Sequence, residues 1–184
     1  MGEDRLEIVV RILLEELGLD VEESPHLQDT PHRVARMLKE LTTPHEFNFT
    51  TFDNKDITHM VVVRDIPFYS LCAHHLLPFF GRGHIAYIPA GKLAGISKFA
   101  RTVKHFSRGL NVQEELTEDI KNFLVENLEP VGVGVVLEGT HLCMAMRGVE
   151  SGHMTTTSAM QGAFLNPDKG AREEFLRLIG KNHG

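Results

Sequence analysis

The stretch SLCAHHLLPFFGRGHIAYIP, residues 70–89, places a thiol beside two imidazoles at the head of an apolar run. Cys72 stands two and three residues before His74 and His75, and the run that follows contains a further histidine, His84. Its later half is rich in β-branched and aromatic residues, which are typical of strands. The stretch therefore predicts a connection that carries thiol and imidazole groups and leads into a strand.

The segments on either side predict helices and strands in pairs. Their order favours an α+β domain with antiparallel hairpins, because a doubly wound parallel sheet needs strands and helices in regular alternation. A small sheet of four strands has two edges, and such a chain can close them against copies of itself. The predicted helices cover residues 3–17, 29–41, 97–110, 112–128 and 171–179, and the predicted strands cover 59–70, 81–89, 131–149 and 154–164.

Two helix starts carry specific signals. Thr30 is a candidate N-cap because Pro31 follows it at the first helical position. Ser97 is a candidate N-cap for the helix that begins KFAR. Residues 44–57 look like a polar connection, so we expect an N-terminal helical region over 1–57 and a second domain, one structural unit, over 58–184.

Composition excludes several classes of protein. The chain has 184 residues and a formal net charge of −6, which argues against a general nucleic-acid binder but not against a small anionic ligand. No apolar run approaches the roughly 20 residues that span a bilayer. The first apolar stretch carries Arg11 and two glutamates, so it is no signal peptide. We expect a cytoplasmic protein without a membrane partner.

The two cysteines of the chain both stand next to histidines. Cys72 and His75 form a C-x-x-H pair, and His141 and Cys143 form an H-x-C pair that would share one face of a strand. Zinc favours such mixed thiolate and imidazole ligands. A disulfide and two inert buried thiols are the alternatives.

The number of candidate ligands favours a catalytic metal. There are five candidates, namely Cys72, His74, His75, His141 and Cys143. Five ligands are too many for a tetrahedral site, whereas a catalytic zinc takes three protein ligands and leaves its fourth position to water. Two histidines then remain for proton transfer, and zinc lowers the pKa of water to about 7, which suits hydrolysis. The chain has no C-x-x-C, no H-E-x-x-H and no phosphate-binding P-loop motif.

Three segments are similar to GTP cyclohydrolase I: YSLCAHHLLPFFGRGHIAYIP, GISKFARTVKHFSRGLNVQEELT and VGVGVVLEGTHLCMAMRGV. The resemblance continues through TTTSAMQGAF, REEF and the DTPHRVARMLKEL helix, and it covers roughly residues 25–180. It implies hydrolysis of GTP, a cyclic amidine, to 7,8-dihydroneopterin triphosphate and formate, the first step towards folate-type pterins. It also implies the tunnelling fold, an antiparallel four-stranded sheet with helices on one side. The expected assembly is a homodecamer of two pentamers with sites at subunit interfaces.

The resemblance implies a role for each candidate residue. The zinc ligands are Cys72, His75 and Cys143. His74 and His141 transfer protons, with His141 protonating N7 of guanine, and Ser97 shuttles protons during the ribose steps if it is more than an N-cap. The residues that bind GTP are Glu114 and Gln113 at guanine and Lys98, Arg101 and Arg147 at the triphosphate. Without the resemblance, the charged residues among these would read as solvated helix positions.

The chain departs from the family pattern near the site. Ala73 replaces a usual glutamate, Glu115 reverses a charge, and the segment 150–157 is shorter and lacks a usual basic residue. A zinc hydrolase that acts on another purine or pterin, or that stops at the formamidopyrimidine, is therefore the alternative enzyme. A nucleotide-binding ring protein without catalysis is the alternative outside enzymes.

Overall fold

The computed structural model describes residues 4–180, and the chain divides into two compact units that meet in sequence at Thr43 and Pro44. Residues 44–57, which the sequence groups with the N-terminal helices, belong to the second unit. Within the described residues, no helix combines the length and the apolar character that a membrane span requires.

The first unit is a pair of helices, α1 (Arg5–Glu16) and α2 (Thr30–Thr42). The side chain of Asp4 caps α1 by accepting a hydrogen bond from the Leu6 N–H at 3.2 Å. The predicted cap of α2 is displaced by one residue: Thr30 is already helical and Asp29 holds the N-cap position. The Thr30 hydroxyl instead donates to the carbonyl oxygen of His26, which lies before the helix.

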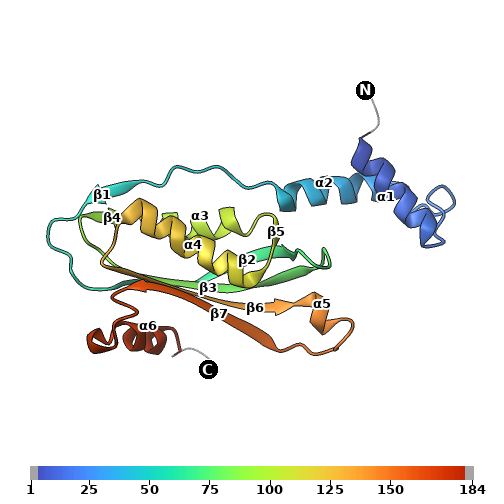
Figure 1. The fold of residues 1–184 in the computed structure, drawn as a ribbon. Helices are drawn as coiled ribbons and strands as arrows, with labels where there is room; N and C mark the ends of the chain where they lie inside the picture. The colour runs from blue at the N-terminus through green and yellow to red at the C-terminus, as the bar shows by residue number, and fades with distance from the viewer. Residues whose placement is uncertain (1–3, 181–184) are drawn as a thin grey trace. The chain divides into compact units, whose positions relative to one another are not determined.

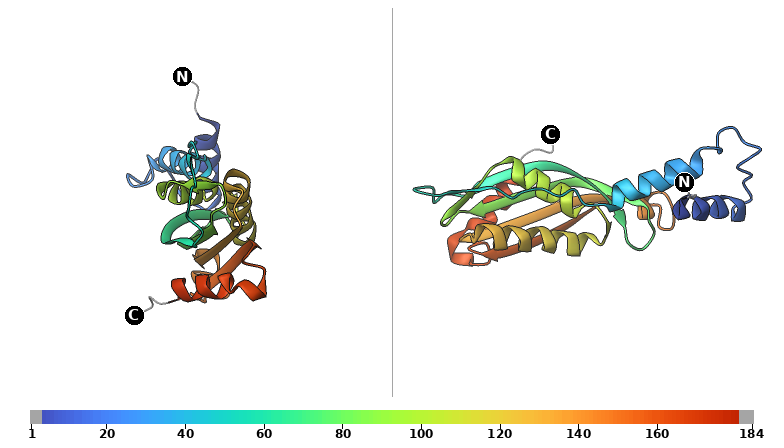
Figure 2. Two further views of the ribbon diagram at one scale, coloured as in Figure 1. Left: turned by 90° about the vertical axis from the view of Figure 1, so that its left-hand side faces the viewer. Right: turned by 90° about the horizontal axis from the view of Figure 1, so that it is seen from above.

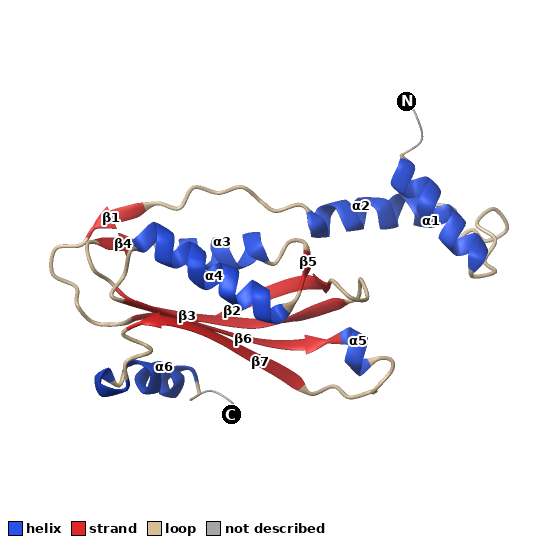
Figure 3. Ribbon diagram, in the orientation of Figure 1, coloured by secondary structure: helices blue, strands red, loops and turns tan. Residues whose placement is uncertain are grey.

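The second unit is built on one five-stranded sheet with the order β5-β2-β3-β6-β7 (Figure 3). Its four long strands are antiparallel, as predicted, but Leu110 and Asn111 add a short fifth strand parallel to β2. A separate two-stranded sheet joins β1 to β4, so the polar connection also contains a strand. The strands are β1 (Thr51–Asp53), β2 (Val61–Cys72), β3 (Pro78–Ile88), β4 (Lys92–Ala94), β5 (Leu110–Asn111), β6 (Gly132–His141) and β7 (Met154–Gly162).

Helices cover both faces of this sheet, whereas the sequence predicts helices on one side (Figures 1 and 2). The helices α3 (Ser97–Phe106) and α4 (Gln113–Leu128) enclose the larger core, in which Ile85 of β3 is fully buried. The neighbouring residue Ala86 points to the opposite face and packs with Phe164 and with Phe175 of α6 (Ala171–Ile179). Since alternate residues of a strand face opposite ways, both faces of the central strands carry apolar side chains. The 3-10 turn η1 (Pro167–Lys169) precedes α6.

The sheet ends earlier than predicted on the strand that leads to Cys143. The sequence predicts one strand over 131–149, but β6 ends at His141 and a short helix, α5 (Leu142–Ala145), follows. The last pairing with β7 joins Thr140 to Met154. Leu, Met and Ala all favour helix, so the backbone can turn once its strand partner is lost.

The third histidine of the opening stretch belongs to the sheet. His84 is buried, and its Nδ1 accepts a hydrogen bond at 3.2 Å from the backbone N–H of Asp65, where β2 has a bulge and a φ of 59°. Its Nε2 lies 3.3 Å from a carboxylate oxygen of Glu138 on β6. His84 therefore joins three strands.

Candidate functional site

The loop between β2 and β3 folds the C-x-x-H pair into a tight turn. The backbone N–H groups of His75 and Leu76 both donate to the carbonyl oxygen of Cys72, at 3.3 and 2.9 Å, and the Cys72 N–H donates to the Leu77 carbonyl oxygen at 2.8 Å. Leu76 takes a left-handed φ of 55° to close the turn. This local geometry brings Nδ1 of His75 to 3.9 Å from Sγ of Cys72.

The pairing of β3 with β6 brings the second cysteine to this turn. Phe79, at the start of β3, is opposite His141, the last residue of β6. Cys143 then projects from α5, so His141 and Cys143 do not lie on one strand face, and the sequence prediction of their arrangement was wrong. The turn at the end of β6 carries Cys143 to 3.9 Å from Cys72, measured between the sulfurs.

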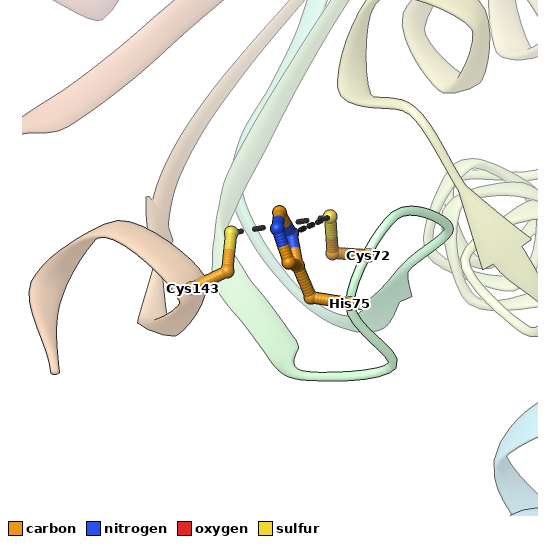
Figure 4. Close-up of side chains that lie close together, drawn as sticks. All are labelled: Cys72, His75 and Cys143. Atoms are coloured by element: carbon orange, nitrogen blue, oxygen red, sulfur yellow. Dashed lines mark hydrogen bonds between the residues drawn. The ribbon is translucent and has the colours of Figure 1, made fainter. Parts of the chain in front are cut away.

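The three donor atoms of Cys72, His75 and Cys143 converge on one point (Figure 4). All of them lie within 4.8 Å of one another, and both cysteines are free thiols. In a tetrahedral zinc site with Zn–S bonds of about 2.3 Å, two sulfurs are about 3.8 Å apart. The observed sulfur separation of 3.9 Å meets that requirement, so these donors fit a zinc ion.

A cavity of about 270 Å³ opens beside the three donors. It receives residues from the β2–β3 turn, from β5 and the start of α4, from the end of β6, from α5 and from the start of β7. Its position beside sulfur and imidazole donors makes it the candidate substrate site. Its walls are formed by Cys72, His74, His75, Asn111, Val112, Gln113, Glu114, His141, Cys143, Met144 and Thr155.

His141 is held on two sides within this cavity. Its Nε2 lies 2.8 Å from Oε1 of Gln113. Its ring stacks on Phe79 with 4.6 Å between centroids and 3° between planes. Burial lowers the pKa of His141, and the nearby charge of Glu114 opposes that effect. Burial and the Glu114 carboxylate therefore act on the pKa of this imidazole in opposite directions, and the effect of burial is the larger.

The second histidine available for proton transfer is more open. His74 is exposed, and its Nδ1 lies 3.9 Å from Sγ of Cys72, so it stands at the cavity wall beside the three donors.

The surroundings of the Cys143 thiol shift its pKa. Burial is the main cause that raises this pKa, the hydrogen bond with Cys72 raises it further, and the charge of Arg147 lowers it. Because a metal binds the thiolate, loading of the site releases protons.

The two residues predicted to bind guanine differ in their surroundings. Both lie in the first turn of α4, where Glu114 is exposed at the cavity wall. Gln113 is 1% exposed, and its side-chain amide is hydrogen-bonded within the protein at both ends. The Glu114 carboxylate is therefore free to meet a ligand in the cavity, whereas the Gln113 side chain is already engaged.

The other predicted substrate residues do not line the cavity of this chain. Ser97 is the first residue of α3, with Ile96 at the N-cap position, so it does not cap the helix as expected. The Lys98 ammonium donates to the Asn48 carbonyl oxygen at 2.6 Å. Arg101 borders a separate cavity of about 180 Å³. Arg147 is exposed just beyond α5.

Several residues of the site escape prediction from the sequence. Phe79 looks like an ordinary strand aromatic, and Thr155 looks like one of several strand threonines. Met144 and Val112 carry no chemical signal. The only available hint was the position of Phe79 at the head of the strand that follows the C-x-x-H pair.

Comparison with known proteins places this site in context. The sequence model of the family described as GTP cyclohydrolase I matches residues 6–180. A GTP cyclohydrolase 1 from Aquifex aeolicus is 51% identical over 181 residues, covering 97% of each chain, and one from Hydrogenobaculum sp. is 48% identical, covering 92% of this chain and 93% of the relative. One from Sulfurihydrogenibium sp. is 49% identical over 184 residues. Among solved structures, an apo archaeosine synthase QueF-Like shares 20% identity and a TM-score of 0.48, covering 59% of this chain and 97% of its own.

Proposed function

The chain belongs to the GTP cyclohydrolase I family and is an enzyme of that family, and we propose that it opens the imidazole ring of GTP with a zinc ion held by Cys72, His75 and Cys143. The products are 7,8-dihydroneopterin triphosphate and formate, and the enzyme acts in the cytoplasm. The observation that carries the proposal is the convergence of three donor atoms within 4.8 Å beside a cavity that also holds two histidines and a carboxylate.

The donor set suits the metal that the reaction requires. Two sulfurs and one imidazole nitrogen would supply three protein ligands to a zinc ion, the number that catalytic zinc sites use. When bound, zinc supplies Lewis acidity that makes water a nucleophile at neutral pH. Ala73 is exposed between the ligands Cys72 and His75 and has no carboxylate, so this position would not contribute to the metal's affinity or acidity.

The histidines move protons during ring opening. C8 of guanine is a weak electrophile, and a proton delivered to N7 makes it open to attack. His141 is placed for this step because it lines the cavity and its orientation is held by Phe79 and Gln113. The exposed His74, on the wall near Cys72, exchanges protons with solvent and with the leaving groups.

Glu114 provides the selectivity for guanine. A carboxylate can accept from N1–H and from the exocyclic amine together, and adenine does not present that pair of donors. Glu114 is exposed at the cavity wall and its charge acts on His141, so it lies close to the reacting end of the site.

The triphosphate contacts and the part of Ser97 in the ribose steps require a second copy of the chain. Ser97, Lys98 and Arg101 lie on α3, outside the cavity that Glu114 and His141 line. We propose that a neighbouring subunit supplies these three residues, within a decamer of two pentameric rings whose sites lie at subunit interfaces. Arg147, whose charge already acts on Cys143, completes the triphosphate site from the same chain.

One assay tests the proposed reaction. The purified protein is incubated with GTP, formate release is measured, and pterin fluorescence is read after oxidation, with and without a chelator. We expect both signals without chelator, neither after chelation, and recovery when zinc is added back. A formamidopyrimidine nucleotide without pterin would favour the incomplete reaction, and GTP binding without formate would favour the nucleotide-binding ring protein.

The change Glu114→Ala is expected to weaken GTP binding by at least about 10-fold, because even one of its two hydrogen bonds, made to a charged group, contributes about 1.5–3 kcal/mol. Equilibrium binding of GTP and of inosine triphosphate, which lacks the exocyclic amine, is measured for both proteins. The variant should lose most of the preference for GTP.

The matched control for this change is Glu115→Ala. Glu115 is the next residue of α4 and is also exposed, but it does not line the cavity. It should bind both nucleotides as the unchanged protein does. Equal GTP affinity in Glu114→Ala and Glu115→Ala would remove Glu114 from the guanine site.

A further inference from the structure

The side chain of Gln113 is almost completely buried although the residue borders the cavity. Its Nε2 lies 3.2 Å from the Leu137 carbonyl oxygen, 3.0 Å from the Thr155 carbonyl oxygen and 3.1 Å from the Thr157 hydroxyl. Its Oε1 faces Nε2 of His141 at 2.8 Å. The amide therefore bridges the sheet and the histidine and leaves no polar atom for a ligand.

We propose that Gln113 is a positioning residue that holds His141 in the tautomer with its proton on Nε2, so that Nδ1 is the nitrogen that exchanges a proton with the substrate. The proposal deepens the proposed function and rests on it for the identity of the substrate. The tautomer of His141 depends only on hydrogen bonds within this chain and not on the identity of the substrate.

The surrounding acceptors fix the orientation of the amide. Two of the three groups around Nε2 of Gln113 are backbone carbonyl oxygens, which can only accept. A flipped amide would place its own oxygen against both of them. The NH₂ group must therefore face the sheet, and Oε1 must face His141.

A chain of hydroxyl groups agrees with this orientation. The Thr117 hydroxyl donates to the Gln113 backbone carbonyl oxygen at 2.6 Å, which uses its only proton. In the 2.6 Å contact between Thr117 and Thr157, the donor is then Thr157. The Thr157 oxygen remains free to accept from the Gln113 amide, so every proton in the network is accounted for.

The tautomer of His141 follows from the orientation of the amide. Because Oε1 of Gln113 can only accept, Nε2 of His141 must carry a hydrogen in order to donate to it. The lone pair of the neutral ring then lies on Nδ1. In the proposed step the ring first takes up a proton from solvent at Nδ1 and becomes an imidazolium. The Nδ1–H bond then breaks as the N7–H bond of guanine forms, the positive charge passes to the purine, and the neutral ring that remains is the tautomer that Gln113 stabilises.

An independent feature of the sheet protects this arrangement. Gly139, two residues before His141 on β6, faces the amide, and a Cβ at that position would lie 2.6 Å from Oε1 of Gln113 and 3.3 Å from the Phe68 ring. A side chain there would displace the oxygen that His141 contacts. Gly139 does not line the cavity, so the space left by its missing side chain is occupied by the Gln113 amide and not by a ligand.

The kinetic test compares Gln113→Met, Gln113→Glu and Thr156→Val. Methionine has similar length but no hydrogen bonds, and we expect kcat to fall about 10- to 100-fold with KM for GTP and zinc content unchanged, as for loss of other groups that orient a functional histidine. Glutamate, when protonated, can both accept from His141 and donate to one carbonyl, so it should recover part of kcat. Thr156 is exposed on the same strand as Thr157 and does not line the cavity, so Thr156→Val should change kcat by less than about threefold.

The spectroscopic test needs no turnover. Solid-state nitrogen NMR of metal-free protein labelled in histidine reports the tautomer of His141, whose signal is identified by its loss in His141→Ala. We expect the Nε2–H form in the unchanged protein and a mixture of tautomers in Gln113→Met and in Gly139→Ala. Observation of the Nδ1–H form in the unchanged protein, or an unaltered kcat in Gln113→Met, would overturn the proposal. A protein with the expected tautomer but no GTP turnover would contradict the proposed function alone.

Discussion

Replacing Cys72 or Cys143 by serine is expected to leave the purified enzyme without zinc and to lower GTP turnover by about 10³-fold or more. Without the ion, the transition state loses Lewis-acid stabilisation of several kcal/mol, and each 1.4 kcal/mol or so corresponds to a tenfold change in rate. The two sulfurs lie 3.9 Å apart and share one ion in the proposed site, so either change removes a ligand that no neighbouring side chain replaces in the same geometry. Elemental analysis gives zinc per chain, and formate release gives turnover.

The control for the cysteine changes is Ala73→Ser. It introduces a hydroxyl next to Cys72 at an exposed position and leaves all three donors in place. It should retain zinc and activity, and circular dichroism should show that all three variants are folded. One zinc per chain in both cysteine variants would show that the ligand assignment is wrong.

The change His141→Ala is expected to keep zinc at the level of the unchanged enzyme and to lower kcat by about 10²- to 10⁴-fold, the range typical of a general acid–base group. His141 lies outside the group of three converging donors, so its loss leaves the metal ligands intact. Its stacking on Phe79 and its contact with Gln113 hold it at the cavity wall, where no other histidine takes the same place. Zinc content, GTP binding and single-turnover formate release are measured on the same sample.

His59→Ala is the matched control for the loss of an imidazole. His59 is exposed and does not line the cavity, so this variant should keep both zinc and turnover. If His141→Ala retains turnover, His74 becomes the proton donor in the proposed mechanism in place of His141. Loss of zinc in His141→Ala would make His141 a ligand and would contradict the proposed set.

Local sequence signals predicted many of the elements well. The helix predicted over 171–179 has those bounds in the structure, and α4 begins at Gln113, one residue inside its predicted range. These segments combine helical spacing of apolar residues with nearby breakers, so short-range rules suffice. The α+β class follows from the order of the elements and is confirmed by the sheet, in which every pair of long strands is antiparallel.

Long-range features were predicted less well. The strand that contains Cys143 was extended too far because the pattern of residues 131–149 does not show where the partner strand β7 begins to pair. The placement of α6 on the opposite face depends on which residues of the central strands point there, and both faces are apolar. Zinc, the decamer and the triphosphate contacts remain predictions.

The order of residues alone was enough to predict the pairing of Cys72 with His75 as candidate ligands, the helical and strand periodicities and, through its resemblance to a family, the reaction. It was not enough to show that Gln113 contacts His141, that Gly139 leaves room for the Gln113 side chain or that Ser97, Lys98 and Arg101 lie away from the cavity of their own chain. Those relations join residues that are far apart along the chain. They depend on strand register and on the directions in which helices leave the sheet, and neighbouring residues in a sequence do not specify either.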